Sequence, residues 1–581
     1  LEDSFCCEVE ITGKGLKDLV YNYPFVFEVS ETEDISGIGS TEEQSFSFNF
    51  ELIEPNQNSP IVGIIDSGIM EEHKYIAPAI TSNKSRSYLI GDSSAADYVE
   101  GGGHGTRVAG AVLYPNGIPI SSEPYQLPCF VRNIRVLDKD NRLVNRLPAE
   151  LMQEIVEDNK DCNIFNLSIN TSVPYRLKHM SSWASTIDTL INQENVIFII
   201  SAGNIHIEDI KNHLNSNTSY PSYLDQSNSR LANPAQSSFA LTVGSVNHIG
   251  FEDENWKSLG EQNDISAFSR IGTGIWGMIK PDVVEFGGGL IASKTEFKTI
   301  RNNEATSPEL VRSTLNGGGA YGKDTVGTSF ATPKVSYIAL KNLLNENINL
   351  LRGLIAQGAR LPNDYFLNPT FNSIRYFGYG IPSLERVTKN TNQRITFYNT
   401  GEIKADEGQI YSLKIPEALR NQADQHNILI EVSLSYTSKV RRTRQLTSSY
   451  LATSLVWTSS KLGQSLNVFE KIVLKQIEDE RIEEENSSDN AQQIKWKIRE
   501  RKDWGEIRDI NRNNSTLQKD WAIIKSYDLS EEISFAVIGR KGWDKTYEPV
   551  QYALIVSIEI LDSNLEIYEA IRIENPIEIE T

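Results

Sequence analysis

Between residues 60 and 390 the chain alternates short, continuous apolar runs with amphipathic stretches. The apolar runs lie at 61–65, 130–137, 163–169, 196–200, 239–246 and near 281–286. Stretches with helical spacing, such as Ala149–Glu157 and Trp183–Ile191, separate several of them. Strands that are apolar on both faces need helices on both sides. We therefore predict an α/β fold with a mostly parallel sheet that helices cover on each face.

Asp66 and His104 stand at favourable places in this pattern. Asp66 ends the run 61–65 and is followed by Ser67-Gly68, and functional groups collect where parallel strands end. A structural Asp that caps a turn is the alternative interpretation. His104 follows three glycines and precedes a helical stretch that reaches about Leu113. The imidazole of His104 then projects from the first turn of that helix, where Asp66 can hold one of its ring nitrogens. A lone His beside glycines is usually a loop residue, which is the alternative interpretation.

Ser329 opens a predicted helix that runs to about Asn345. Gly327 allows a tight turn before it, and Pro333 falls in the first turn, where a missing N–H leaves little unsatisfied. The N-terminus of a helix offers free N–H groups and a positive dipole end to a developing oxyanion. An N-capping Ser is the alternative role. Together, Asp, His and Ser are the groups that turn a weak hydroxyl into a nucleophile.

The segments 60–68, 103–110 and 327–333 resemble the three triad motifs of the subtilisin-like serine proteases, the subtilases, in the order Asp, His, Ser. The resemblance implies a serine endopeptidase that works through an acyl-enzyme intermediate. It also implies that Asn204, in Ser201-Ala202-Gly203-Asn204, helps form the oxyanion hole. The substrate-binding residues that it implies are Ser168, Ile169, Asn170, Ser201, Ala202 and Gly203.

The sequence departs from the subtilase pattern at several points. Arg107 stands where many relatives have a second His, and Ile169-Asn170 replaces the usual Leu-Gly. A side chain at the latter place narrows or polarises the substrate groove. The stretch after His104 has no obvious counterpart of the usual calcium-binding loop. We therefore predict no metal and no cofactor for catalysis, while structural calcium stays open.

The composition divides the chain into four parts. Residues 1–35 resemble half of the inhibitor-like prodomain of subtilases, with any small βαβ fragment as the alternative, and 36–58 read as a linker. Residues 59–390 form the predicted peptidase domain. Residues 391–581 form a β-rich domain with a charged helical insertion near 468–512, either a solvated arm or a docking surface. Its six expected strands, typical of an antiparallel sandwich, are 410–415, 426–435, 450–457, 533–537, 552–560 and 565–573.

The charge and the cysteines limit the partners and the compartment. A net charge of −21 argues against nucleic-acid binding, and the apolar runs are too short to span a bilayer. Cys6, Cys7, Cys129 and Cys162 are four thiols in a large chain, and they have no metal-ligand spacing. The sequence therefore predicts no disulfide framework, and it slightly favours a reducing, cytoplasmic location over secretion. The first residue is Leu, so we expect that the true N-terminus was lost or trimmed.

Two other functions stay open beside the endopeptidase that cleaves polypeptide substrates. One is a gated processing protease, held off by its N-terminal unit or controlled by a regulatory protein partner through the C-terminal domain. The other is a binding-only scaffold on a protease fold. A missing triad residue would favour the scaffold, and none of the three is missing.

Overall fold

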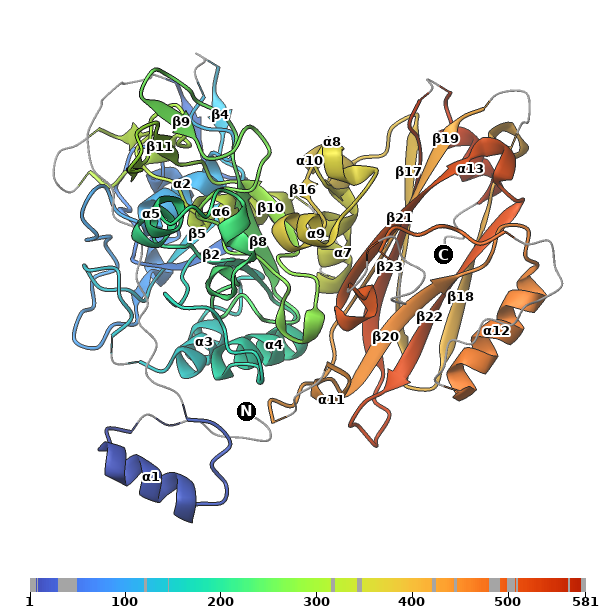
Figure 1. The fold of residues 1–581 in the computed structure, drawn as a ribbon, viewed down its shortest axis with the longest axis horizontal. Helices are drawn as coiled ribbons and strands as arrows, with labels where there is room; N and C mark the ends of the chain where they lie inside the picture. Colours follow the sequence, from blue (N-terminus) through green and yellow to red (C-terminus); the bar gives the residue numbers. More distant parts are fainter. Residues whose placement is uncertain are drawn as a thin grey trace. The chain divides into compact units, whose positions relative to one another are not determined.

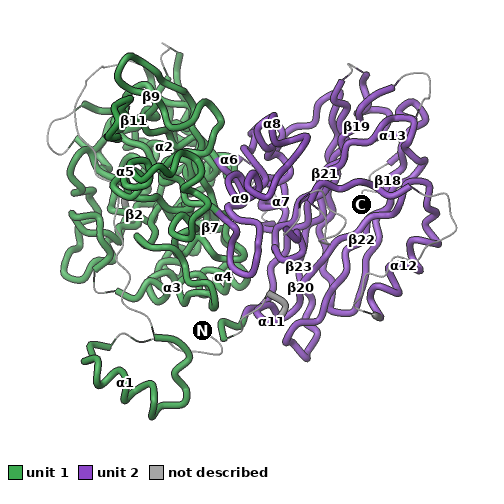
Figure 2. The backbone as a smooth tube through the Cα atoms, viewed as in Figure 1, with its two compact units in different colours: residues 1–271, 285–340, 441–445 green, residues 272–284, 341–440, 446–581 purple. Residues whose placement is uncertain are grey.

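A computed structural model describes residues 7 and 9–575, except for 30–49, 120–122, 145, 315–318, 342–346, 421–424, 444–446, 480–491, 499–506, 508–509 and 563–564. The chain divides into two compact units, shown in Figure 2. Unit 1 comprises residues 1–271, 285–340 and 441–445, and unit 2 comprises 272–284, 341–440 and 446–581. Most of the predicted linker 36–58 lies outside the described residues.

A seven-stranded sheet forms the centre of the first part of the fold (Figure 1). Its order is β10-β8-β7-β6-β2-β5-β3, and the pairs among β3, β5, β2, β6, β7 and β8 are parallel. The strands are β2 (Ile61–Asp66), β3 (Arg86–Ser87), β5 (Phe130–Arg135), β6 (Ile164–Leu167), β7 (Ile197–Ser201), β8 (Leu241–Val246) and β10 (Val283–Phe286). Every residue of β6, β7 and β8 is buried, as expected for strands that are covered on both faces.

Helices cover both faces of this sheet, which confirms the predicted α/β class. Figure 1 shows α2 (Gly105–Leu113) and α6 (Thr328–Leu340) on one side of the sheet, and α3 (Pro148–Asp158) and α4 (Ser182–Glu194) on the other. The remaining elements of unit 1 are α1 (Gly13–Asn22), α5 (Ile207–Asn215), β1 (Leu52–Ile53), β4 (Tyr125–Gln126), β9 (Trp256–Ser258), β11 (Ile291–Ser293), β12 (Ile300–Arg301), β13 (Leu310–Val311) and β14 (Tyr321–Gly322).

The N-terminal segment contains the expected helix, α1. Thr12 caps it through a hydrogen bond from the Gly15 N–H. Residues 25–29, expected to be extended, pair with no strand in the described part of the chain. They contact the body of unit 1 instead: the Phe27 ring lies 4.5 Å from that of His179, and Glu28 forms an ion pair with Arg442.

Unit 2 contains the two antiparallel sheets of the predicted sandwich. One has the order β17-β23-β19-β21 and the other β18-β22-β20. The strands are β17 (Arg394–Ile403), β18 (Gly408–Lys414), β19 (Asn427–Tyr436), β20 (Thr453–Ser459), β21 (Leu517–Lys525), β22 (Glu532–Lys541) and β23 (Val550–Ile560). The other elements are α7 (Ile348–Gly358), α8 (Asn363–Phe366), α9 (Phe371–Phe377), α10 (Leu384–Thr388), α11 (Thr447–Tyr450), α12 (Leu466–Asp479), α13 (Tyr568–Glu574), β15 (Ala359–Arg360) and β16 (Ile381–Pro382).

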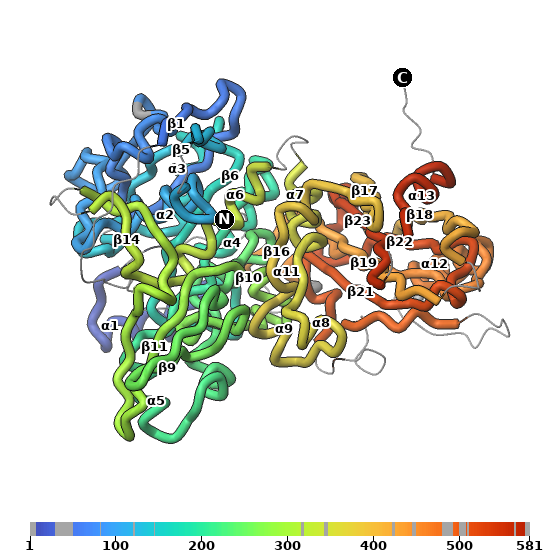
Figure 3. Tube along the Cα trace, turned by 90° about the horizontal axis from the view of Figure 1, so that it is seen from above, coloured from blue at the N-terminus to red at the C-terminus, as the bar shows by residue number. Residues whose placement is uncertain are grey.

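Two sequence predictions about unit 2 need correction. The expected strand 565–573 contains the helix α13, because its buried residues Ile567 and Ile571 are four positions apart, a helical spacing. The charged insertion begins with α12, which is not a solvated arm. Its Phe469 and Val473 pack against Ala536 and Ile538 of β22, and Figure 3 shows α12 beside β22 and β18.

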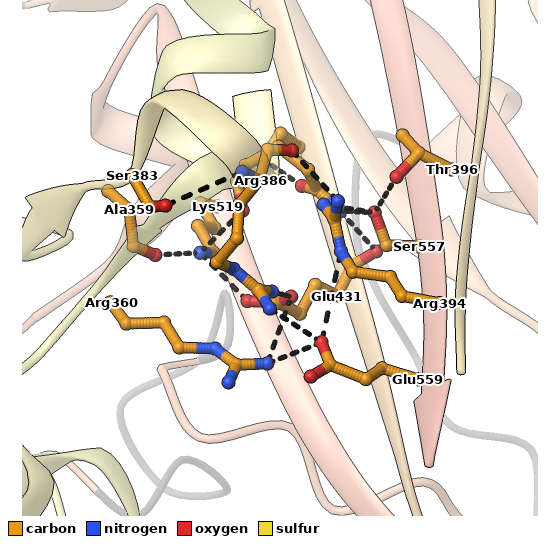
Figure 4. Close-up of polar contacts among 12 residues, drawn as sticks. Ala359, Arg360, Ser383, Arg386, Arg394, Thr396, Glu431, Lys519, Ser557 and Glu559 are labelled. Carbon is orange, nitrogen blue, oxygen red and sulfur yellow. Dashed lines mark hydrogen bonds and ion pairs between the residues drawn. The ribbon is translucent and has the colours of Figure 1, made fainter. Parts of the chain in front are cut away.

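A group of buried charges connects β15 and α10 with the four-stranded sheet of unit 2 (Figure 4). Glu431, which is fully buried on β19, pairs with Lys519 at 2.9 Å and with Arg386 at 2.6 Å. Burial would raise the pKa of Glu431, but these cations outweigh it and lower the pKa to about 2. Glu559 pairs with Arg386 and Arg360. A charge this deeply buried is tolerated only because several partners surround it.

Candidate active site

Asp66 and His104 meet at the end of β2. Asp66 is the last residue of that strand, is fully buried, and accepts a hydrogen bond from the Ser67 N–H at 2.7 Å. Its Oδ1 also lies 2.6 Å from Nδ1 of His104, the residue before the first turn of α2. The carboxylate therefore fixes one ring nitrogen of the imidazole and leaves the other free to face a reactant.

The surroundings of His104 favour the charged form of its imidazole. Burial lowers the pKa of His104, but the charge of Asp66 and the hydrogen bond to it outweigh this effect, and the pKa is raised above its ordinary value. Two further charges modify it, since Asp97 raises the pKa and Arg107 lowers it. A stabilised imidazolium is what a general base needs after it has taken a proton.

Ser329 is the second residue of α6 and is 6% exposed. In the described part of the chain, its hydroxyl donates to the Ser168 carbonyl at 3.0 Å and not to His104. The next residue, Phe330, places its ring 5.7 Å from the His104 imidazole. The start of α6 therefore adjoins the histidine, although the Ser329 hydroxyl points to another acceptor. Catalytic hydrogen bonds are often not yet formed in an unliganded site.

A chain of polar contacts holds the start of α6 against β6. The Ser168 hydroxyl donates to the Ser329 carbonyl at 3.1 Å and accepts a hydrogen bond from the Asn166 amide at 2.9 Å. About two turns further along α6, Ser336 donates to the Asn166 oxygen at 3.0 Å. All four residues are buried. Their side chains therefore fix where Ser329 lies relative to the end of β6.

Asn204 is oriented by Thr328, the residue before Ser329. Its side-chain oxygen accepts hydrogen bonds from the Thr328 N–H at 3.0 Å and from the Thr328 hydroxyl at 3.1 Å. Both bonds use the oxygen, so within the described ranges of the chain the amide nitrogen is available as a donor. A Cβ atom added at Gly327 would lie 3.7 Å from this nitrogen. The Asn204 donor therefore lies beside the turn that leads to Ser329.

The predicted substrate-binding residues lie directly after β6 and at or directly after the end of β7. Ser168 and Ile169 are buried and Asn170 is half-buried. Within the described residues, the backbone groups of Ile169 and Asn170 make no hydrogen bonds, which is a requirement for pairing with an added strand. Ser201, Ala202 and Gly203 are buried, and Gly203 has a φ of 97°, which favours glycine.

The sequence reasoning missed Asp97, a second buried carboxylate, which lies at the start of α2. Its oxygens accept hydrogen bonds from the Thr106 N–H, the Thr106 hydroxyl and the Ser67 hydroxyl at 2.7–2.9 Å. Ser67 in turn accepts from the Gly105 N–H at 2.9 Å. This network ties the end of β2 to the start of α2. The sequence signals for this network were the polar residues Ser67, directly after Asp66, and Thr106, in the first helical turn after His104.

Arg107, the departure from the usual second His, takes part in a buried ion-pair group. Its guanidinium lies 3.0 Å from Asp324, which Arg312 also contacts at 3.3 Å. Asp324 lies five residues before Ser329, so the pair links α2 to the loop that precedes α6. Arg107 therefore has a structural partner in this chain and is not free to bind a substrate.

The described residues contain neither a metal-binding cluster nor a membrane-spanning helix. Among them, no three His, Cys, Asp or Glu side chains are grouped so as to hold a metal ion. No helix in the described ranges combines the length and the apolar character needed to cross a bilayer.

The chain is similar to a known protein family and to a curated relative. Residues 57–352, just over half of the chain, match the profile described as "Subtilase family". The uncharacterized protein y4bN of Sinorhizobium fredii is 28% identical over 314 residues, which are 51% of this chain and 72% of y4bN.

Solved structures of proteases also match. They include a lanthipeptide protease, with 17% identity over 57% of this chain and 86% of that one, and a TM-score of 0.38. The epidermin leader peptide processing serine protease of Staphylococcus aureus has 17% identity over 58% and 76%, and a TM-score of 0.37. A cold adapted subtilisin-like serine proteinase has 20% identity over 56% and 89%, and a TM-score of 0.32.

Proposed function

The chain belongs to the subtilase family and is a serine endopeptidase, and from this premise we propose that Asp66, His104 and Ser329 form its catalytic triad. The observation that carries the proposal is the 2.6 Å contact between the buried Asp66 carboxylate and His104 Nδ1. The start of the helix that carries Ser329 adjoins the same imidazole. These three residues have the roles of orienting group, general base and nucleophile.

The first step is the activation of Ser329. Its hydroxyl leaves the Ser168 carbonyl by rotation of the side chain and donates instead to His104 Nε2. His104 then takes the proton while Ser329 Oγ attacks the carbonyl carbon of the peptide bond. Asp66 stabilises the imidazolium that forms, in keeping with the raised pKa of His104.

The second step is the collapse of the tetrahedral intermediate. The amide of Asn204 and the N–H of Ser329 donate hydrogen bonds to the oxyanion, and His104 gives its proton to the leaving amine. Water then attacks the acyl-enzyme with the same base and the same oxyanion donors. An extended substrate pairs with the backbone at 168–170. Protein groups alone perform these steps, so we propose that catalysis needs no metal. Peptidase activity measured in the presence of a metal chelator tests this, and we expect the activity to persist.

Cleavage of an unfolded protein tests the triad. We expect the native chain to cleave reduced casein and Ser329→Ala to lose that activity, because the nucleophile is gone. Ser216→Ala is the matched control, since Ser216 is exposed at the end of α5. Cleavage by Ser329→Ala at the native rate would overturn the proposal.

A second candidate is a gated processing protease, and the contacts of the N-terminal segment favour it. Glu28 forms its ion pair with Arg442, whose Nε also donates to the Met180 carbonyl at 3.1 Å. Arg176 donates to the Val29 carbonyl at 3.2 Å. A segment held in this way can restrain the enzyme until it is released. Glu28→Gln should then raise the rate of casein cleavage, and an unchanged rate would remove the gating role of this contact.

A further inference from the structure

Two chain segments leave the same edge of the central sheet side by side. β6 and β7 are parallel neighbours, with Leu167 opposite Ile200. The segment after β6 begins with Ser168, which contacts Ser329, and the segment that ends β7 leads to Asn204. A peptide carbonyl that contacts both Ser329 and Asn204 must lie between the ends of these two segments. The side chain on the acyl side of the cleaved bond then enters the gap between them.

The side chain of Asn170 bridges the two segments at the near end. Its amide nitrogen donates to the Ser201 carbonyl at 2.8 Å, and its oxygen accepts a hydrogen bond from the Ser201 hydroxyl at 2.5 Å. Ser201 is fully buried, while Asn170 is half-buried. Because the amide uses both its ends on one residue, it is held across the gap and does not swing into solvent.

The guanidinium of Arg270 contacts the same two segments farther from the ends of β6 and β7. It donates to the Ser172 carbonyl at 2.7 Å and to the Asn204 carbonyl at 3.1 Å, and so it joins the two segments a second time. Two more of its bonds go to the Asn228 and Arg230 carbonyls. Arg270 is 3% exposed, and a Cβ atom added at Gly203 would lie 2.9 Å from its Cδ. Nothing bulky fits between Gly203 and this side chain.

From these two bridges we propose that the protease cleaves after small residues, namely glycine, alanine and serine. The Asn170 amide occupies the volume that a large side chain on the acyl side would need, and Arg270 prevents the gap from deepening. Displacing Asn170 would also leave the buried Ser201 hydroxyl without its acceptor, a cost that a large side chain cannot repay. This inference rests on the proposed function of Ser329 and Asn204.

Cleavage of a peptide mixture tests the proposal. The native protein is incubated with peptides from a digested proteome, and mass spectrometry identifies the residue on the acyl side of every new cut. We expect glycine, alanine and serine to dominate. In Asn170→Gly, the ratio of kcat/KM for a phenylalanine peptide to that for the matched alanine peptide should rise by about tenfold or more. Ser201→Ala, which removes one of the two bonds, should raise the ratio less.

Asn217→Gly is the matched control. Asn217 is exposed and has a φ of 61°, so glycine fits its backbone and the ratio should stay at the native value. Cuts by the native protein after phenylalanine or leucine as often as after alanine would overturn the proposal, as would an unchanged ratio in Asn170→Gly. A native protein that reacts with a fluorophosphonate yet cuts after large residues contradicts this inference alone. One that neither reacts nor cuts contradicts the proposed function, and the inference falls with it.

Discussion

Ser168 and Ser329 exchange hydrogen bonds in both directions. The Ser329 hydroxyl donates to the Ser168 carbonyl at 3.0 Å, and the Ser168 hydroxyl donates to the Ser329 carbonyl at 3.1 Å. The pair holds the proposed nucleophile in a resting orientation. A peptide that pairs with the backbone at 168–170 supplies N–H donors to the same carbonyl. We expect this competition to free the Ser329 hydroxyl for His104, so that substrate binding itself completes the triad.

The first prediction concerns the carboxylate of the proposed triad. Asp66→Asn keeps the shape of the side chain but removes the charge that orients His104 and stabilises its imidazolium. We expect kcat/KM to fall by about three to four orders of magnitude while the fold is kept. Steady-state kinetics on a fluorogenic peptide measures the loss, and circular dichroism checks the fold. A decrease of less than tenfold would show that Asp66 does not act on the imidazole.

The second prediction is a pH dependence. A general base must be neutral, and the pKa of His104 is raised. Activity should therefore be low in acid and rise with pH through a value above the ordinary histidine pKa of about 6.5. In Asp66→Asn this rise in activity should occur at lower pH, because the charge that raises the pKa of His104 is gone. If the activity of the native protein rose with a midpoint below pH 6, the electrostatic account would be contradicted.

The third prediction concerns Asn204, the proposed oxyanion donor. Asn204→Leu removes the amide but keeps the approximate volume. We expect kcat to fall by about 10²–10³ with little change in KM, because the donor acts mainly on the transition state. Thr328→Ala removes one of the two bonds that orient Asn204 and should give a smaller decrease of the same kind. Equal kcat for native protein and Asn204→Leu would exclude the amide from the reaction.

The fourth prediction tests the buried charges of unit 2. Glu431→Gln removes the counter-charge of Lys519 and one of the two carboxylates that pair with Arg386. It should lower the free energy of unfolding by about 3–5 kcal/mol. Glu417→Gln, on the surface, should change it little. Because folding lowers the pKa of Glu431 to about 2, its contribution is full above about pH 4.5 and is lost as the pH falls towards 2. Urea unfolding at pH 7 and pH 3 measures both effects.

Much of the central sheet could be predicted from the sequence, whereas parts of unit 2 could not. Strands such as 61–65 and 196–200 are continuously apolar because they are covered on both faces. β21 was missed because it carries Lys519 and Asp520, charged residues that are typical of a surface. Both are buried here, since each has a partner of opposite charge, Glu431 and Arg512. Such pairing joins residues far apart in the sequence and leaves no local pattern.

Some features of the candidate site could likewise be predicted from the sequence, and others could not. Asp66, His104 and Ser329 stand in short motifs that can be recognised one at a time, and in the structure the Asp66 carboxylate contacts the His104 ring. The rotation of the Ser329 hydroxyl towards Ser168 and the network around Asp97 could not be predicted. Both depend on how loops and helix ends meet in three dimensions, and neither has a periodic signal in the sequence.

The site of reaction with a fluorophosphonate tests the central claim most directly. The native protein is treated with the reagent and digested, and mass spectrometry locates the phosphonylated residue. We expect a single adduct on Ser329 that is absent in Ser329→Ala and forms far more slowly in His104→Ala. An adduct on another serine, or equal rates in the native protein and His104→Ala, would contradict the triad.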